Sequence, residues 1–176
     1  MLDSARDLVC EFGPRAVSVD DIAAAAGVGK QTIYRWWPSK SAVIMDALIE
    51  LTDPVPADLP EGAYEAIRLQ MRRVARMFAS RNGELIRELV ADSQGDPALA
   101  EDFRNRFFAH RRARAADTLV KGVRSGELRP DLDIDDALDL LSAPLWLHLL
   151  IGHRPTSQAA ADRLLDLAWP GLKNQT

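Results

Sequence analysis

Residues 27–40, GVGKQTIYRWWPSK, combine basic, amide, hydroxyl and aromatic side chains and contain no carboxylate. Lysine and arginine donate well to guanine O6 and N7, and glutamine forms two hydrogen bonds with adenine. Lys30, Gln31 and Arg35 are therefore candidates for contacts with bases. The chemistry that suits this stretch is non-covalent binding to DNA.

Other side chains in and near this stretch suit phosphate oxygens, which fix the register of a protein on DNA without reading its sequence. The hydroxyls of Ser18, Thr32 and Tyr34 can donate to phosphate. The indole of Trp36 can donate to phosphate or stack on a sugar. Lys40 falls in the first turn of the following predicted helix, where its ammonium and the exposed backbone amides can hold one phosphate together.

Two short predicted helices must position these side chains. The first begins at Ser18, an N-cap residue that Asp21 completes to a capping box. It ends at Gly27, which supplies the positive φ of a tight turn. The second runs over 29–37 and stops at Pro38, because proline cannot donate the next backbone hydrogen bond. The pair has the layout of a helix-turn-helix, in which the second helix enters the major groove.

The rest of the chain also has helical periodicity, and no segment shows the sustained alternation of a strand. We therefore predict an all-α fold. Further helices are predicted over 2–12, 39–51, 64–80, 85–95, 97–126, 134–151 and 156–169. The proline-rich segment TDPVPADLPEG at 52–62 predicts a hinge, so we expect a DNA-binding domain over 1–51 and a helical domain over 52–176.

The composition narrows the class of protein. The chain of 176 residues carries a net charge of −4, so binding to DNA requires a local basic patch. A single cysteine excludes an internal disulfide and indicates a reducing cytoplasm, where we expect the protein to associate with the nucleoid. The most apolar run, 140–152, is shorter than the roughly 20 residues of a membrane span, so no contact with a membrane is expected.

Residues 17–51 resemble the TetR/AcrR family of bacterial transcription regulators. The segment VSVDDIAAAAGVGKQTIYRWWPSKSAVIMDAL carries the resemblance, with Thr32, Tyr34, Trp37 and Lys40 in matching order and spacing. The resemblance implies a dimeric all-α protein of about nine helices, with a three-helix DNA-binding domain before a helical domain for ligand binding and dimerisation. It also implies that DNA contacts fall at Ser18, Lys30, Gln31, Thr32, Tyr34, Arg35, Trp36 and Lys40.

The first helix of the helix-turn-helix departs from this family pattern. Asp20 and Asp21 stand where some relatives carry a base-reading arginine. Because carboxylates repel phosphate, we expect this helix to read no bases and to keep some distance from the DNA backbone.

The C-terminal region predicts an effector pocket and a dimer interface. Apolar side chains that can line a pocket for a small, largely apolar effector are Met71, Phe78, Leu89, Phe103, Phe107 and Trp146. Two apolar faces can form a four-helix bundle with a second copy of the chain. They consist of Leu138, Leu141, Leu145 and Leu149 on one helix and Leu164, Leu165, Ala168 and Trp169 on the next.

The favoured hypothesis is a homodimeric repressor that binds a near-palindromic operator and leaves it when an effector binds. An enzyme is disfavoured, because no nucleophile–base pair, phosphate-binding loop or metal-ligand cluster is visible, and no cofactor is expected. A helical ligand-binding or interaction module with lost or weak DNA binding stays open as an alternative. The arginine-rich run at 104–117 is more typical of a solvated helix face than of a second anion-binding surface.

Overall fold

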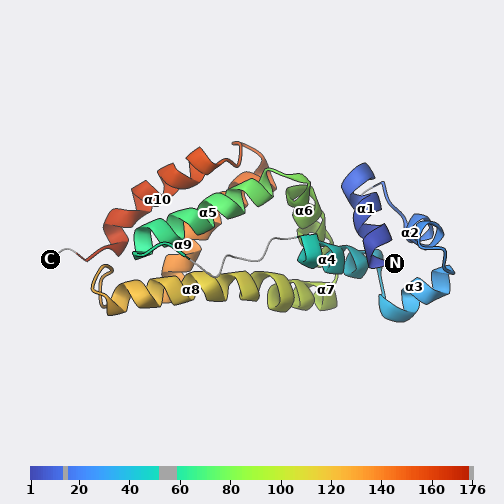
Figure 1. Ribbon diagram of the computed structural model, residues 1–176, viewed down its shortest axis with the longest axis horizontal. Coiled ribbons are helices and arrows are strands. Elements are labelled where there is room, and N and C mark those ends of the chain that lie inside the picture. The colour runs from blue at the N-terminus through green and yellow to red at the C-terminus, as the bar shows by residue number, and fades with distance from the viewer. Residues whose placement is uncertain (14–15, 52–58, 175–176) are drawn as a thin grey trace. The chain divides into compact units, whose positions relative to one another are not determined.

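The computed structural model describes residues 1–13, 16–51 and 59–174. Its helices, drawn in Figure 1, are α1 (Leu2–Phe12), α2 (Val19–Ala25), α3 (Lys30–Trp36), α4 (Lys40–Leu51), α5 (Ala63–Phe78), α6 (Arg81–Ser93), α7 (Pro97–Asp102), the π-helix η1 (Phe103–Phe108), α8 (Ala109–Arg124), α9 (Ile134–Ile151) and α10 (Gln158–Leu172). Because α7, η1 and α8 follow one another without a break, the described ranges hold nine separate helical runs. The prediction of an all-α fold of about nine helices is confirmed.

The chain forms two compact units. Unit 1 consists of Met1–Asp53 and Ser80–Phe108, and unit 2 consists of Pro54–Ala79 and Ala109–Thr176. Residues 80–108 thus pack with the N-terminal helices. The domain division at residues 51 and 52 stays a prediction, and most of the predicted hinge, residues 52–58, lies outside the described residues.

Unit 1 is organised around α4, which contacts α1, α6 and η1. Its largest fully buried side chains are Ile22, Ile33, Ile44, Met45, Leu48, Leu85, Ile86 and Leu89. Burial of one such side chain contributes roughly 1.5–3 kcal/mol. Ile22 on α2 and Ile33 on α3 are both buried, and the two helices are in contact, as the sequence predicts.

Unit 2 consists of α5, α8, α9 and α10, with α5 in contact with the other three helices. Figure 1 shows α10 alongside α5. The guanidinium of Arg72 on α5 donates through Nε and one terminal nitrogen to the two carboxylate oxygens of Asp162 on α10, each over 2.7 Å. Gly122 lets α8 approach α5 closely, because a Cβ at this position would lie 2.7 Å from the Cβ of Ala63.

The start of α5 is capped by a residue distant in the sequence. The carboxylate of Glu127 accepts the backbone N–H groups of Ala63 at 2.6 Å and Tyr64 at 3.0 Å. Gly62, at the N-cap position, has no side chain to do so. A carboxylate at a helix N-terminus is favourable because the free N–H groups there carry partial positive charge.

The leucine stripe predicted for the dimer interface lies in the core of unit 2 instead. Leu138, Leu141, Leu145 and Leu149 are each at most 5% exposed, and Leu165 on α10 is fully buried. Leu164, Ala168 and Trp169 are half-buried. This part of the prediction is wrong. α9 carries leucine on more than one face, and the predicted face packs against α5, α8 and α10 of the same chain. The large apolar side chains of α9 and α10 that are exposed are Leu140, Leu147, Leu150, Ile151 and Leu167.

Candidate nucleic-acid interface

The helix-turn-helix begins with the predicted capping box. The Ser18 hydroxyl oxygen accepts the backbone N–H of Asp21 at 3.2 Å, and the Asp21 carboxylate accepts the backbone N–H of Ser18 at 2.8 Å. Gly27 has a φ of 65°, which allows the tight turn between α2 and α3. Trp37 is extended at the end of α3, directly before Pro38. The predicted local geometry is therefore confirmed.

The capping box also uses the Ser18 hydroxyl, which the sequence predicts to donate to a DNA phosphate. The hydroxyl of Ser18 donates to Asp21 Oδ2 over 2.6 Å, and this hydrogen bond lowers the pKa of Asp21. A hydroxyl has one proton to donate. A contact between Ser18 and phosphate would therefore break this bond and bring phosphate close to a carboxylate, which argues against the predicted contact.

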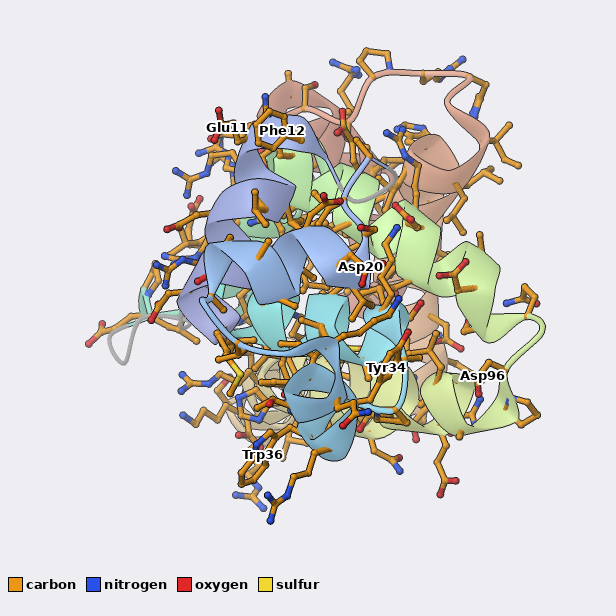
Figure 2. The ribbon with its side chains drawn as sticks, turned by 90° about the vertical axis from the view of Figure 1, so that its right-hand side faces the viewer. Glu11, Phe12, Asp20, Tyr34, Trp36 and Asp96 are labelled. Atoms are coloured by element: carbon orange, nitrogen blue, oxygen red, sulfur yellow. The ribbon has the colours of Figure 1, made fainter. Side chains whose placement is uncertain are left out.

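The outward face of α3 carries the predicted DNA-binding side chains. Gln31 and Arg35 are exposed, and neither side chain forms a hydrogen bond or an ion pair with the residues that the structure describes. Tyr34 is 47% exposed and Trp36 is 67% exposed. Figure 2 shows Tyr34 on the viewer's side of unit 1 and Trp36 pointing away from the end of α3. Thr32 is half-buried beside them.

Lys30 is exposed as well, but it has a partner on α2. Its Nζ lies 2.9 Å from Oδ2 of Asp20 and 6.0 Å from the centre of the Tyr34 ring. The hydrogen bond to Asp20 raises the pKa of Lys30 and so favours its charged form. Helical periodicity does not predict this pair, because the two residues are ten positions apart and on different helices.

Trp37 lies at the C-terminal end of α3 and is half-buried. Its indole Nε1–H donates to Asp46 Oδ2 on α4 over 2.7 Å. The other oxygen of Asp46 lies 2.7 Å from a guanidinium nitrogen of Arg106 on η1, and this contact raises the pKa of Arg106. Arg106 is also paired with Asp102 at 3.1 Å. Asp46 and Arg106 therefore tie the recognition helix to η1, a role that nothing in the sequence pattern indicates.

Lys40, the predicted phosphate ligand at the start of α4, is half-buried. Its Nζ lies 3.7 Å from Oε1 of Glu88 on α6. The neighbouring hydroxyl of Ser41 donates to Asp92, also on α6, over 2.6 Å. The beginning of α4 is thus held to α6 by two polar contacts, and a phosphate at Lys40 would compete with a long, weak ion pair.

The six residues predicted to line an effector pocket are divided between the two units. Met71 and Phe78 are buried in unit 2, and the Phe78 ring meets the half-buried Trp146 edge-on with centroids 4.8 Å apart. Leu89, Phe103 and Phe107 are buried in unit 1, where the two phenylalanine rings lie 5.1 Å apart. Their assignment to an effector stays a prediction.

Two negative observations apply to the described part of the chain. Among its residues, no three His, Cys, Asp or Glu side chains gather closely enough to hold a metal ion. Within the same ranges, no helix combines the length and the apolar character needed to span a membrane.

Comparison with known proteins gives the same assignment for both parts of the chain. Residues 1–47 match the family of bacterial regulatory proteins described as the tetR family, and residues 63–168 match the tetracyclin repressor-like C-terminal domain. The chain is 43% identical over 174 residues to the uncharacterized HTH-type transcriptional regulator YdeS of Bacillus subtilis, covering 98% of this chain and 88% of YdeS.

Two solved structures extend this likeness to the fold. The TetR family transcription regulator SCO0332 superposes with a TM-score of 0.78 at 28% identity, covering 97% of this chain and 94% of its own. The transcriptional regulator FadR of Bacillus subtilis, crystallised with stearoyl-CoA, superposes with a TM-score of 0.70 at 19% identity, covering 94% of each chain. At that identity, the second likeness concerns the fold alone.

Proposed function

Because this chain belongs to the tetR family and is a DNA-binding transcriptional regulator, we propose that it acts as a homodimeric repressor which a small-molecule effector releases from a near-palindromic operator. The observation that carries the proposal is the outward face of α3. It presents amide, phenol, guanidinium and indole groups from Gln31, Tyr34, Arg35 and Trp36 at the surface of unit 1. Such a set matches the donors that bind bases and phosphates in a major groove.

The exposed apolar face of unit 2 supports dimerisation. Leu140, Leu147 and Ile151 on α9 are 54%, 52% and 68% exposed, and Leu167 on α10 is 81% exposed. An exposed apolar face of this kind commonly marks a protein–protein contact. We propose that a second copy of the chain covers this face by two-fold symmetry, in a bundle of α9 and α10 from both copies.

Charge along α9 fits an antiparallel pairing of two copies. The helix starts among exposed carboxylates, with Asp133 and Asp136 in or next to its first turn. Exposed basic groups, His153 and Arg154, directly follow its last turn. A two-fold axis across α9 brings the acidic start of one copy to the basic end of the other. The pairing therefore adds electrostatic complementarity to the apolar contact.

The effector is proposed to be a largely apolar small molecule. Support comes from the buried apolar side chains predicted for the pocket, Met71 and Phe78 with Trp146 against them, in unit 2. The stearoyl-CoA complex of FadR, a protein of the same fold, is consistent with a ligand of this class. To release DNA, the effector must bind the DNA-free conformation more tightly than the DNA-bound one, since equal affinity shifts no equilibrium.

Two further parts of the proposal concern what the protein does not do and where it works. We propose that it is not an enzyme, because the families and relatives that it matches are regulators. We place it in the cytoplasm at the nucleoid, since its operator is there.

A binding experiment with the intact protein tests the proposal. The protein is titrated into duplex DNA from the region flanking its own gene, and the complex is followed by gel shift at several salt concentrations. We expect a complex that weakens steeply with salt, because bound basic groups release counterions from phosphate. A thermal-shift screen then finds effectors, and each hit is added to the complex. Failure to bind any flanking duplex more tightly than unrelated DNA would contradict the proposal.

A further inference from the structure

Asp20 and Lys30 form an ion pair on the exposed surface of the helix-turn-helix. Asp20 lies in the first turn of α2 and Lys30 is the first residue of α3. Their side chains are 67% and 48% exposed, and Lys30 Nζ lies 2.9 Å from Asp20 Oδ2. An exposed pair of this kind adds little to stability, because water screens it. Stability therefore does not explain the pair, whereas its position at the start of the recognition helix suits a role in binding DNA.

That position is the part of a helix-turn-helix that meets base edges. The N-terminal residues of the recognition helix contact bases in the major groove. The Lys30 ammonium has three N–H donors and spends one on Asp20, so two remain. The second carboxylate oxygen of Asp20 accepts no hydrogen bond from the residues that the structure describes. The pair thus presents donors and an acceptor side by side.

A G·C base pair presents the complementary pattern in the major groove. Guanine offers two neighbouring acceptors, N7 and O6, and cytosine offers the N4 amino donor beside them. An A·T pair places the adenine N6 donor between two acceptors, so that the lysine meets a donor and the carboxylate meets thymine O4. We propose that Asp20 and Lys30 together read one G·C pair, with Lys30 on guanine and Asp20 on cytosine.

This inference rests on the proposed binding of DNA by α3 and reverses the sequence-based expectation that α2 reads no bases. The competing account is that Asp20 only repels phosphate and masks Lys30. The two accounts differ in what they predict for DNA sequence. Repulsion from phosphate acts alike on every duplex, whereas reading of a base pair acts at one position.

Selection from randomised duplexes separates the two accounts. The parent, Asp20→Ala and Lys30→Ala proteins each select binding sites, and dissociation constants are then measured for duplexes with each of the four base pairs at every position. For the parent we expect a preference of about tenfold or more for G·C at one position. Both variants should lose that preference at the same base pair and keep the preferences elsewhere.

Two more variants control for charge and folding. Glu11→Ala removes one negative charge from the end of α1, which Figure 2 shows away from Asp20, and it should keep the full G·C preference. Asp20→Asn keeps the size of the side chain and removes its charge. It replaces Asp20→Ala if the alanine variant has a lower melting temperature than the parent protein. The proposal predicts a weakened form of the same preference in Asp20→Asn, because the amide offers one acceptor oxygen where the carboxylate offers two.

Several results would overturn the inference. Equal strengthening of every duplex by Asp20→Ala would show repulsion alone, and loss of preference at different base pairs in the two variants would show that the residues do not act together. A parent protein that selects sites but shows no G·C preference that both variants lose would also overturn it, while leaving DNA binding intact. A parent protein that selects no duplex would instead overturn the proposed function.

Discussion

The carboxylate of Asp46 on α4 bridges two other helices of unit 1, because it accepts the indole N–H of Trp37 through one oxygen and faces the Arg106 guanidinium through the other. Both separations are 2.7 Å. Trp37 ends the recognition helix, and Arg106 belongs to η1. A π-helix is uncommon and often occurs at functional positions. The orientation of α3 is therefore coupled, through one carboxylate, to the packing of η1.

Replacement of Trp37 by phenylalanine tests this link. The variant Trp37→Phe keeps an aromatic ring but removes the N–H that Asp46 accepts. Because hydrogen bonds to charged groups contribute about 1.5–3 kcal/mol, we expect a loss of that order in the free energy of unfolding, measured by urea denaturation. The matched variant Trp36→Phe, at a ring that is 67% exposed, should change it by no more than about 0.5 kcal/mol. Equal effects of the two substitutions would contradict the role of Asp46.

Lys40→Ala should weaken the binding of all DNA sequences alike. Lys40 is predicted to contact phosphate, which carries no sequence information. We expect the dependence of log K on log salt to become shallower by about one unit, since one fewer counterion is released. Lys121→Ala, an exposed lysine on α8 in unit 2, serves as the control and should leave both the affinity and the slope unchanged. An unchanged slope for Lys40→Ala would mean that Glu88 keeps Lys40 away from DNA.

Gln31→Ala should change sequence preference at one base position. Gln31 is exposed on the first turn of α3, and a bidentate glutamine–adenine contact contributes about 1–3 kcal/mol to discrimination. Competition titrations with single-base variants of the operator measure the effect position by position. The exposed Gln158 on α10 supplies the control substitution, Gln158→Ala, for which we expect parental preferences at all positions. A uniform loss across sequences in Gln31→Ala would assign this side chain to phosphate instead.

The sequence predicted the helix-turn-helix well because its signals are local. The capping box at Ser18, the positive φ of Gly27 and the stop at Pro38 each depend on residues within a few positions. The exposure of α3 followed from the same periodicity that buries Ile33.

The long-range contacts of unit 1 had no such signal. Lys30 meets Asp20 ten residues away, Trp37 meets Asp46, and Arg106 reaches Asp46 from η1. Charged residues are common on helix surfaces, so their pairing depends on how the helices pack, which periodicity does not encode. The segment that forms η1 was predicted as part of one long helix, since a shift from α- to π-type hydrogen bonding leaves the apolar pattern nearly unchanged.

The prediction of the interface leucines is wrong for a related reason. Leucine occupies several faces of α9, so periodicity shows that the helix is apolar without showing which face meets its own chain. The buried Leu145 and the exposed Leu147 are the same residue type on the same helix, and they differ in the side of the helix from which they project. Packing against α5, α8 and α10 decides between them.

Leu147→Glu should therefore dissociate the proposed dimer without unfolding the protomer. Leu147 is 52% exposed, and in the proposed pairing a carboxylate here would be buried against apolar side chains of the second copy without a partner. Light scattering with size-exclusion chromatography should give the mass of one chain instead of two. Phe12→Glu, at a residue that is 58% exposed on α1, is the control and should stay dimeric. A variant Leu147→Glu that keeps the dimeric mass would rule out this face as the interface.

The pH dependence of stability should depend on His148. Burial, followed by the nearby charges of His153, Arg154 and Arg163, lowers the pKa of His148 below its usual value of 6.5. Its buried Nδ1 has no hydrogen-bond partner among the described residues, so the neutral ring is the form that the fold accepts. The unfolded chain then binds more protons than the folded chain below pH 6.5, and the stability that is present above this pH is lost as the pH falls.

Thermal unfolding between pH 5 and pH 7.5 measures this loss. We expect the melting temperature of the parent protein to fall toward pH 5, and that of His148→Phe to fall less, because the phenyl ring fills the same space and does not titrate. His110→Phe, at an exposed position of α8, should keep the parental slope. Arg72 and Arg68 hold the pKa of Asp162 below its usual value of 3.8. The ion pairs of Asp162 are therefore lost at a lower pH than this range, and their loss does not obscure the effect of His148. Identical slopes in His148→Phe and the parent would show that another group causes the loss.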